Sequence, residues 1–187
     1  MKKNIVAYCL LSIVYFFSSC SSGKNENTGT PEERKMLVAT IDSLQKKMFN
    51  QQTMELDKNL AAKGVATYQD FVKKFPDDSL SADYLFRSSD LFRALGDNKK
   101  AIENLGQICK SYPDFKKVPE CLFLQGYYYQ EFFNDTVHAK EFYNQLISKY
   151  PNHAFVKDAK ALMNMFGKSE EDIIKGFEKK DQEKKKI

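Results

Sequence analysis

Three helix ends recur along the middle of this chain, and they restrict its fold more than any other feature. The segments FVKKFP, ICKSYP and LISKYP end at Pro76, Pro113 and Pro151, which are 37 and 38 residues apart. Each proline stops a helix, because its ring removes a backbone donor and disfavours helical geometry in the residue before it. A fixed period of this size, built from two helices, is typical of a helical solenoid in which each unit packs on the next.

A second matched feature lies between these ends. The segment LGDNKKAIENL (95–105) aligns with FNDTVHAKEFY (133–143), and each reads as a turn followed by a helix with a small residue, Ala101 or Ala139. From residue 31 onward no segment alternates apolar and polar residues with a period of two, so no strand is expected. The remaining alternative is a generic helical bundle with a coincidental period. The favoured prediction is an all-α superhelix of about eight helices.

These residues resemble the tetratricopeptide repeat (TPR) family, whose helix pairs carry small residues where the helices cross and a proline at the end. The first repeat, 82–115, matches at Leu85, Ser89, Phe92, Ala101, Leu105, Ile108 and Pro113. The second repeat, 119–153, matches at Leu122, Gly126, Tyr129, Ala139, Tyr143, Leu146 and Pro151. The resemblance covers roughly residues 57–166, with degenerate capping helices on either side. It implies a TPR-like domain over residues 31–187.

The resemblance also implies a binding groove, because the first helices of TPR pairs line a concave surface that holds protein partners. The positions that it assigns to this groove are Asp83, Phe86, Asp90, Arg93, Phe123, Tyr127, Gln130 and Glu131. The segment FLQGYYYQEFF carries more aromatic residues than one buried stripe can absorb, which favours some exposed rings. The alternative is that all these rings pack against neighbouring repeats, as aromatic residues at helical spacing usually do.

The beginning of the chain reads as an export signal. Lys2 and Lys3 precede an apolar run from Ile5 to Phe17, which as a helix would span only about 20 Å, less than the roughly 30 Å of a bilayer core. The run ends in FSSC, which resembles the lipobox of bacterial lipoproteins and implies that Cys20 becomes a lipid-modified N-terminus. An ordinary cleaved signal with a chance cysteine is the alternative. We therefore expect a signal peptide at 1–19 and a lipidated flexible tether at 20–30.

A lipobox followed by TPR helices resembles a class of envelope lipoproteins. That class includes the TPR lipoprotein of the outer-membrane β-barrel assembly machinery, and the periplasmic TPR coordinator of cell division has similar helices. The resemblance implies a protein-binding scaffold at the outer membrane of a Gram-negative bacterium, facing the periplasm, with Ser21 after the cysteine favouring outer-membrane delivery. The alternative is a surface-exposed lipoprotein that helps to capture nutrients or glycans.

Charge and motif content argue against several other classes. Removal of residues 1–19 leaves 27 basic and 25 acidic residues, which makes no electrostatic case for nucleic acid. His138 and His153 have no metal-ligand spacing, and we find no phosphate loop or nucleophile motif. We therefore expect no enzyme, no metal, no cofactor and no small-molecule substrate.

Three further segments remain open to interpretation. Cys109 and Cys121 could pair in an oxidising compartment, or could be two small buried residues, and spacing alone does not say which way they face. The apolar stripe of the first expected helix, at Leu37, Ile41, Leu44 and Met48, is too short to indicate a coiled coil and is expected to pack on its own solenoid. The segment KSEEDIIKGFEKK is expected to form a helix that covers the open end.

Overall fold

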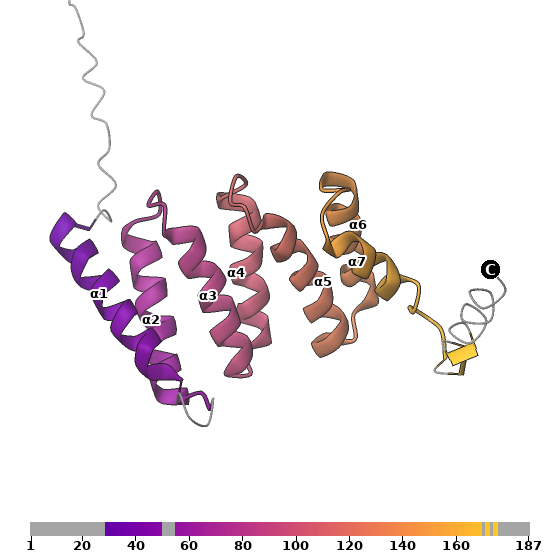
Figure 1. Ribbon diagram of the computed structural model, residues 1–187, viewed down its shortest axis with the longest axis horizontal. Helices are drawn as coiled ribbons and strands as arrows, with labels where there is room; N and C mark the ends of the chain where they lie inside the picture. Colours follow the sequence, from indigo (N-terminus) through magenta and orange to yellow (C-terminus); the bar gives the residue numbers. More distant parts are fainter. Residues whose placement is uncertain (1–28, 50–54, 170, 173, 176–187) are drawn as a thin grey trace, which may run out of the picture.

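The computed structural model describes residues 29–49, 55–169, 171–172 and 174–175, and within them it contains α-helices and no strand. The helices stand side by side in one row and alternate in direction, so that each packs on the next along the chain (Figure 1). This arrangement confirms the predicted all-α superhelix. The seven named helices in the described residues are α1 (Pro31–Met48), α2 (Lys58–Lys74), α3 (Ser81–Ala94), α4 (Asn98–Ser111), α5 (Val118–Phe133), α6 (Thr136–Lys149) and α7 (Phe155–Met163).

The helices α2, α4 and α6 begin in the same way. At each start an aspartate side chain accepts hydrogen bonds from the first turn: Asp57, Asp97 and Asp135 are these N-caps. Such caps satisfy backbone N–H groups that have no partner within the helix. A shared cap and a shared direction show that the three helices occupy equivalent places in the stack.

The same helices also end in the same way, as the aromatic-proline pattern predicts. Phe75, Tyr112 and Tyr150 are the C-caps, and each donates its N–H to the carbonyl four residues earlier. The proline that follows cannot continue the helix, so the chain turns into the next one. The predicted helix ends are therefore confirmed.

Small residues lie where paired helices cross, and they set how closely the pairs approach. Ala101 and Ala139 are fully buried. The Ser89 hydroxyl on α3 donates to the Ala101 carbonyl on α4 at 2.9 Å. In the next pair, a Cβ at Gly126 would lie 2.7 Å from the Tyr143 ring and 3.1 Å from the Ala139 carbonyl. The two predicted repeats therefore share one crossing geometry, with serine in one and glycine in the other.

The structure adds a complete helix pair, α1–α2, where the sequence indicated only degenerate capping helices. Ala61 is fully buried and holds the place in α2 that Ala101 holds in α4, four residues after the aspartate cap. Leu37, Ile41 and Met48 of α1 are buried in the same core, and α1 packs on α2. The apolar stripe of α1 thus packs on its own solenoid, as expected.

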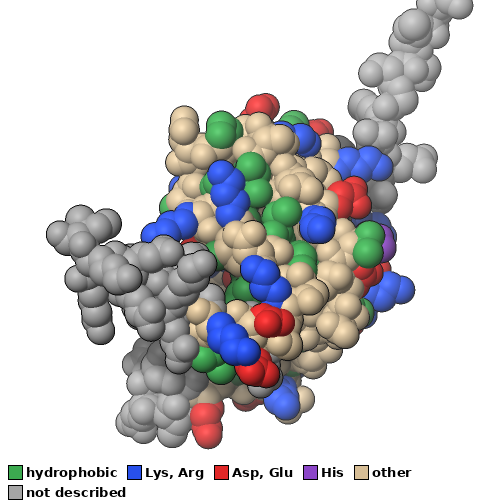
Figure 2. Space-filling model, turned by 90° about the vertical axis from the view of Figure 1, so that its right-hand side faces the viewer, with side chains coloured by type: hydrophobic (Ala, Val, Ile, Leu, Met, Phe, Trp, Pro, Cys, Tyr) green, Lys and Arg blue, Asp and Glu red, His purple; other side chains and the backbone are tan. Residues whose placement is uncertain are grey.

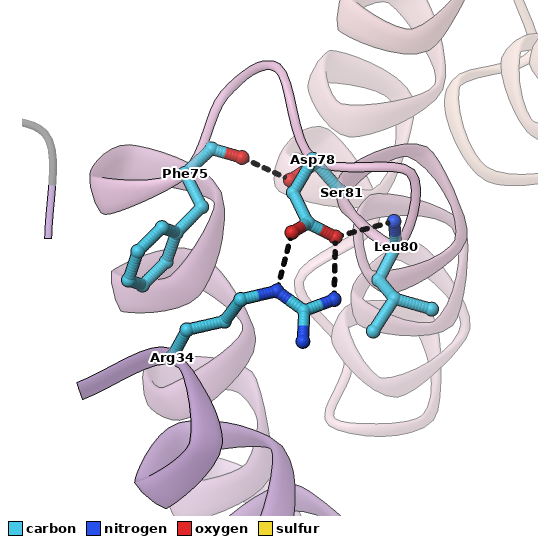
Figure 3. A network of polar contacts seen from close by, with 5 residues as sticks. All are labelled: Arg34, Phe75, Asp78, Leu80 and Ser81. Atoms are coloured by element: carbon cyan, nitrogen blue, oxygen red, sulfur yellow. Dashed lines mark hydrogen bonds and ion pairs between the residues drawn. The ribbon is translucent and has the colours of Figure 1, made fainter. Parts of the chain in front are cut away.

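Polar contacts fasten α1 to the turn between α2 and α3 (Figure 3). The Arg34 guanidinium binds both carboxylate oxygens of Asp78, with Nε 2.5 Å from Oδ2 and a terminal nitrogen 3.2 Å from Oδ1. Asp78 also accepts from the backbone N–H of Leu80 at 2.9 Å, and Ser81 donates its hydroxyl to the Phe75 carbonyl at 2.5 Å. Arg34 therefore holds the first helix against a turn that begins the second pair.

The other end of the row is the α7 end, which Figure 2 faces. Apolar side chains appear there between Lys and Arg side chains (Figure 2), and Leu162, Met163 and Phe166 are only partly buried. Residues 171–172 and 174–175 are helical, and Ile174 is 58% exposed. Ile173 and Phe177 lie outside the described residues, so the expected cover over this end stays a prediction.

Candidate protein-binding face

One side of the stack is formed by the first helix of each pair, that is by α1, α3 and α5. The candidate site lies on this side. A hollow of about 340 Å³ opens between α1 and α3. It is lined by Gln45, Met48, Phe49, Tyr68, Arg87, Asp90 and Leu91. Asp90, one of the predicted groove residues, lines this hollow. The hollow has both charged and apolar walls, which suits a protein segment with mixed side chains.

Lys117, at the start of α5, joins the α3 and α5 parts of this face. Its ammonium lies 3.5 Å from a carboxylate oxygen of Asp83 and 4.4 Å from the centre of the Phe86 ring. Arg87 binds the other oxygen of Asp83 at 2.6 Å, one helical turn along α3. Two predicted groove residues of α3, Asp83 and Phe86, therefore share one cation, which comes from the turn that leads into α5.

Asp90 and Arg93 of α3 lie near enough to Tyr128 of α5 to affect the pKa of its hydroxyl. The Asp90 side chain is open to solvent, but the surrounding protein partly desolvates its carboxylate and raises its pKa, as expected of a group in a concavity. Tyr128 is 2% exposed. Burial, followed by the charge of Asp90, raises the pKa of Tyr128 to about 12, and the charge of Arg93 opposes that rise.

The four predicted residues of α5 have unequal environments. Phe123 stacks on Phe155 with ring centres 4.6 Å apart, so its ring is engaged in packing against α7. The Gln130 side chain accepts from the Tyr143 hydroxyl at 3.3 Å. Tyr127 is half-buried, and Glu131 is exposed. Tyr127 and Glu131 are therefore the α5 candidates that can contact a partner, whereas Phe123 and Gln130 mainly hold neighbouring helices together.

Reasoning from the sequence missed two residues of this face: Arg87 and Lys117. Arg87 follows Asp83 by four residues on one helix, a spacing that favours an ion pair and could have been recognised. Lys117 belongs to a turn, and no periodicity indicates which helix a turn residue approaches.

Cys109 and Cys121 are both free thiols in the structure. Cys121 is fully buried and Cys109 is partly buried. In the described ranges, no group of three or more His, Cys, Asp or Glu side chains is arranged to hold a metal ion. Likewise, no helix within those ranges has the length and apolar character to cross a bilayer.

The family of the repeats follows from comparison with known proteins. A tetratricopeptide-repeat model matches residues 83–114 and 120–153. The matched segments hold the pairs α3–α4 and α5–α6, so the fold is a TPR-like superhelix. No curated protein matches the chain significantly. TPR repeats typically form scaffolds that bind proteins rather than enzymes, and the match supports protein partners for this chain.

Proposed function

We propose that this chain is a lipid-anchored TPR scaffold that binds protein partners in the cell envelope and acts in outer-membrane assembly or maintenance. The observation that carries the binding part is the joined face of α3 and α5, where Lys117 connects Asp83 and Phe86. Charged and aromatic side chains on a concave surface are typical anchors for a protein partner. The protein acts by binding, without catalysis.

The anchor rests on the FSSC motif, and residues 1–28 lie outside the described residues. Lipid on Cys20 would hold the superhelix at the membrane through the tether 20–30, which ends just before α1. Stable attachment takes more than one acyl chain, and lipobox processing supplies that number. We propose the outer membrane, with the superhelix facing the periplasm.

Metabolic labelling with a tagged fatty acid tests the anchor. The native chain should incorporate label, and the Cys20→Ala variant should lose it. Cys9→Ala is the matched control, because Cys9 lies within the proposed signal peptide and should leave labelling unchanged. Undiminished label on Cys20→Ala would contradict lipidation at this residue.

Protease treatment of intact cells tests the side of the membrane. A periplasm-facing scaffold should resist cleavage until the outer membrane is opened. Cleavage on intact cells would contradict the periplasmic proposal and favour a surface lipoprotein that assists nutrient or glycan capture.

A further inference from the structure

Cys109 and Cys121 lie on two neighbouring helices, α4 and α5, that pack against each other. Cys109 is near the end of α4, and Cys121 is in the first turn of α5. The amide nitrogen of Gln125 lies 3.5 Å from the Cys109 sulfur and 3.2 Å from the Cys121 carbonyl oxygen. Because Cys121 and Gln125 are four residues apart, they share one face of α5. The Cys109 sulfur therefore lies against the face that carries Cys121.

The two thiols differ in chemistry. A hydrogen bond from the Cys121 thiol is the largest cause that lowers the pKa of Cys109, and the charge of Lys149 on α6 adds to it. The pKa of Cys121 is raised, first by its hydrogen bond with Cys109 and then by burial. Cys109 is partly exposed, while Cys121 is fully buried. Cys109 is thus the accessible nucleophile, and Cys121 is placed to react after it.

We propose that Cys109 and Cys121 form a reversible disulfide that cross-links α4 to α5 when the chain meets a disulfide oxidant. The Cys109 thiolate attacks one sulfur of the oxidant's disulfide and releases the other sulfur as a thiol. Cys121 then loses its proton and attacks the Cys109 sulfur, which releases the second thiol of the oxidant. Two cysteine thiols are oxidised, and one disulfide of the oxidant is reduced to two thiols.

The bond would act on the junction between the two matched repeats. It closes the chain from residue 109 to residue 121, which contains the turn from α4 into α5. A covalent link there fixes how the second repeat sits on the first, and it restrains the unfolded chain. An exported compartment supplies disulfide oxidants, whereas the cytosol keeps thiols reduced. This inference rests on the proposed export of the chain, but not on the binding face or on the lipid anchor.

Peptide mapping after oxidation tests the proposal directly. The purified full chain is treated with oxidised glutathione, remaining thiols are alkylated, and the protein is digested with trypsin. Cleavage after Lys100, Lys110, Lys117 and Lys140 separates the two cysteines, so the disulfide would appear as peptide 101–110 joined to peptide 118–140. We expect this linked pair, its loss on reduction with dithiothreitol, and a Tm higher by roughly 5–10 °C in the oxidised form.

Single variants test the order of the two steps. Cys121→Ala should stop at a glutathione mixed disulfide on Cys109, and Cys109→Ala should leave Cys121 unmodified because that thiol is buried. In the native chain, alkylation of both cysteines after oxidation, or glutathione that stays on Cys109, would overturn the proposal. A linked peptide that joins Cys109 to Cys9 or Cys20 would overturn it as well.

Discussion

At the residue scale, two adjacent tyrosines of α5 separate folding from binding. Tyr128 is 2% exposed, and its ring packs in the core. Tyr127 is half-buried, and its hydroxyl makes no hydrogen bond within the described residues. Tyr128 therefore contributes to the core, whereas the neighbouring Tyr127 is available to contact a partner.

We predict that Tyr128→Ala mainly weakens folding, whereas Tyr127→Ala mainly weakens partner binding. Tyr128→Ala should lower the free energy of unfolding by about 3–5 kcal/mol, because a large buried ring is lost. Tyr127→Ala should lower it less, and should weaken partner affinity by about 2 kcal/mol, roughly thirtyfold. Urea denaturation measures stability, and titration with the partner measures affinity. If Tyr127→Ala is strongly destabilised but its folded fraction binds the partner normally, Tyr127 is not part of the binding face.

Ala101 provides a second test at this scale, because it fixes the crossing of α3 and α4. Ala101→Leu should lower the free energy of unfolding by about 1–3 kcal/mol, since the larger side chain has no space beside α3. Lys99→Leu, on the exposed surface of the same helix, should change it by less than about 0.5 kcal/mol. Chemical denaturation compares the two, and equal small effects would contradict the crossing geometry.

The sequence predicts which small residues lie where helices cross, but it does not predict which aromatic rings are exposed. The alignment of Ala101 with Ala139 indicated tight crossings, and both are fully buried. Phe123 and Tyr127 both fall on the predicted groove side of α5, yet Phe123 stacks on Phe155 of α7. Periodicity gives the side of a helix that a residue occupies. It does not give the neighbouring helix that covers part of that side.

At the scale of elements, the contact between Arg34 and Asp78 makes the seating of α1 sensitive to acid. Hydrogen bonding from Arg34 is the largest cause that lowers the pKa of Asp78 below its ordinary value of 3.8. A lowered carboxyl pKa stabilises the folded protein above the unfolded pKa, and this stabilisation is lost as pH falls through the folded pKa. The contribution of Asp78 should therefore be complete at neutral pH and disappear below 3.8.

The Asp78→Asn variant tests this contact. It should lower the free energy of unfolding at neutral pH, and its difference from the native chain should shrink as pH falls through the lowered pKa of Asp78. Asp77→Asn is the matched control, because Asp77 lies in the same turn and is exposed. Urea denaturation over a pH series measures both. A difference that stays constant through the acid range would contradict an ionised Asp78 in the contact.

The helix pair α1–α2 shows why the sequence indicated only degenerate capping helices at this end, and not a complete pair. Its second helix carries the aspartate cap, the small residue and the aromatic-proline end of the other pairs. Residues 49–57 connect α1 to α2, and this connection is longer than the connections within the other two pairs. The spacing of the repeat is therefore lost on the α1 side. Only packing in three dimensions shows that α1 completes the pair.

At the scale of the whole molecule, the fold follows from the repeat, while the partner does not. Each helix pair leaves an apolar face that the next pair covers, so a period of 37 or 38 residues dictates a row of pairs. The binding face depends on contacts between pairs, such as Lys117 of one pair with Asp83 of another. Those contacts arise from turn residues that lie outside the repeat pattern.

The central claim is that the α3–α5 face, and not the opposite side of the stack, holds a protein partner. Site-specific photo-crosslinking in intact cells tests it most directly, with the photoreactive residue at position 93 or 127 on this face. Gln107 is the matched control, because it is exposed on α4 and lines a different hollow with α2 residues. We expect a discrete crosslinked product from positions 93 and 127 and none from position 107. A product from position 107 alone, or equal products from all three, would contradict it.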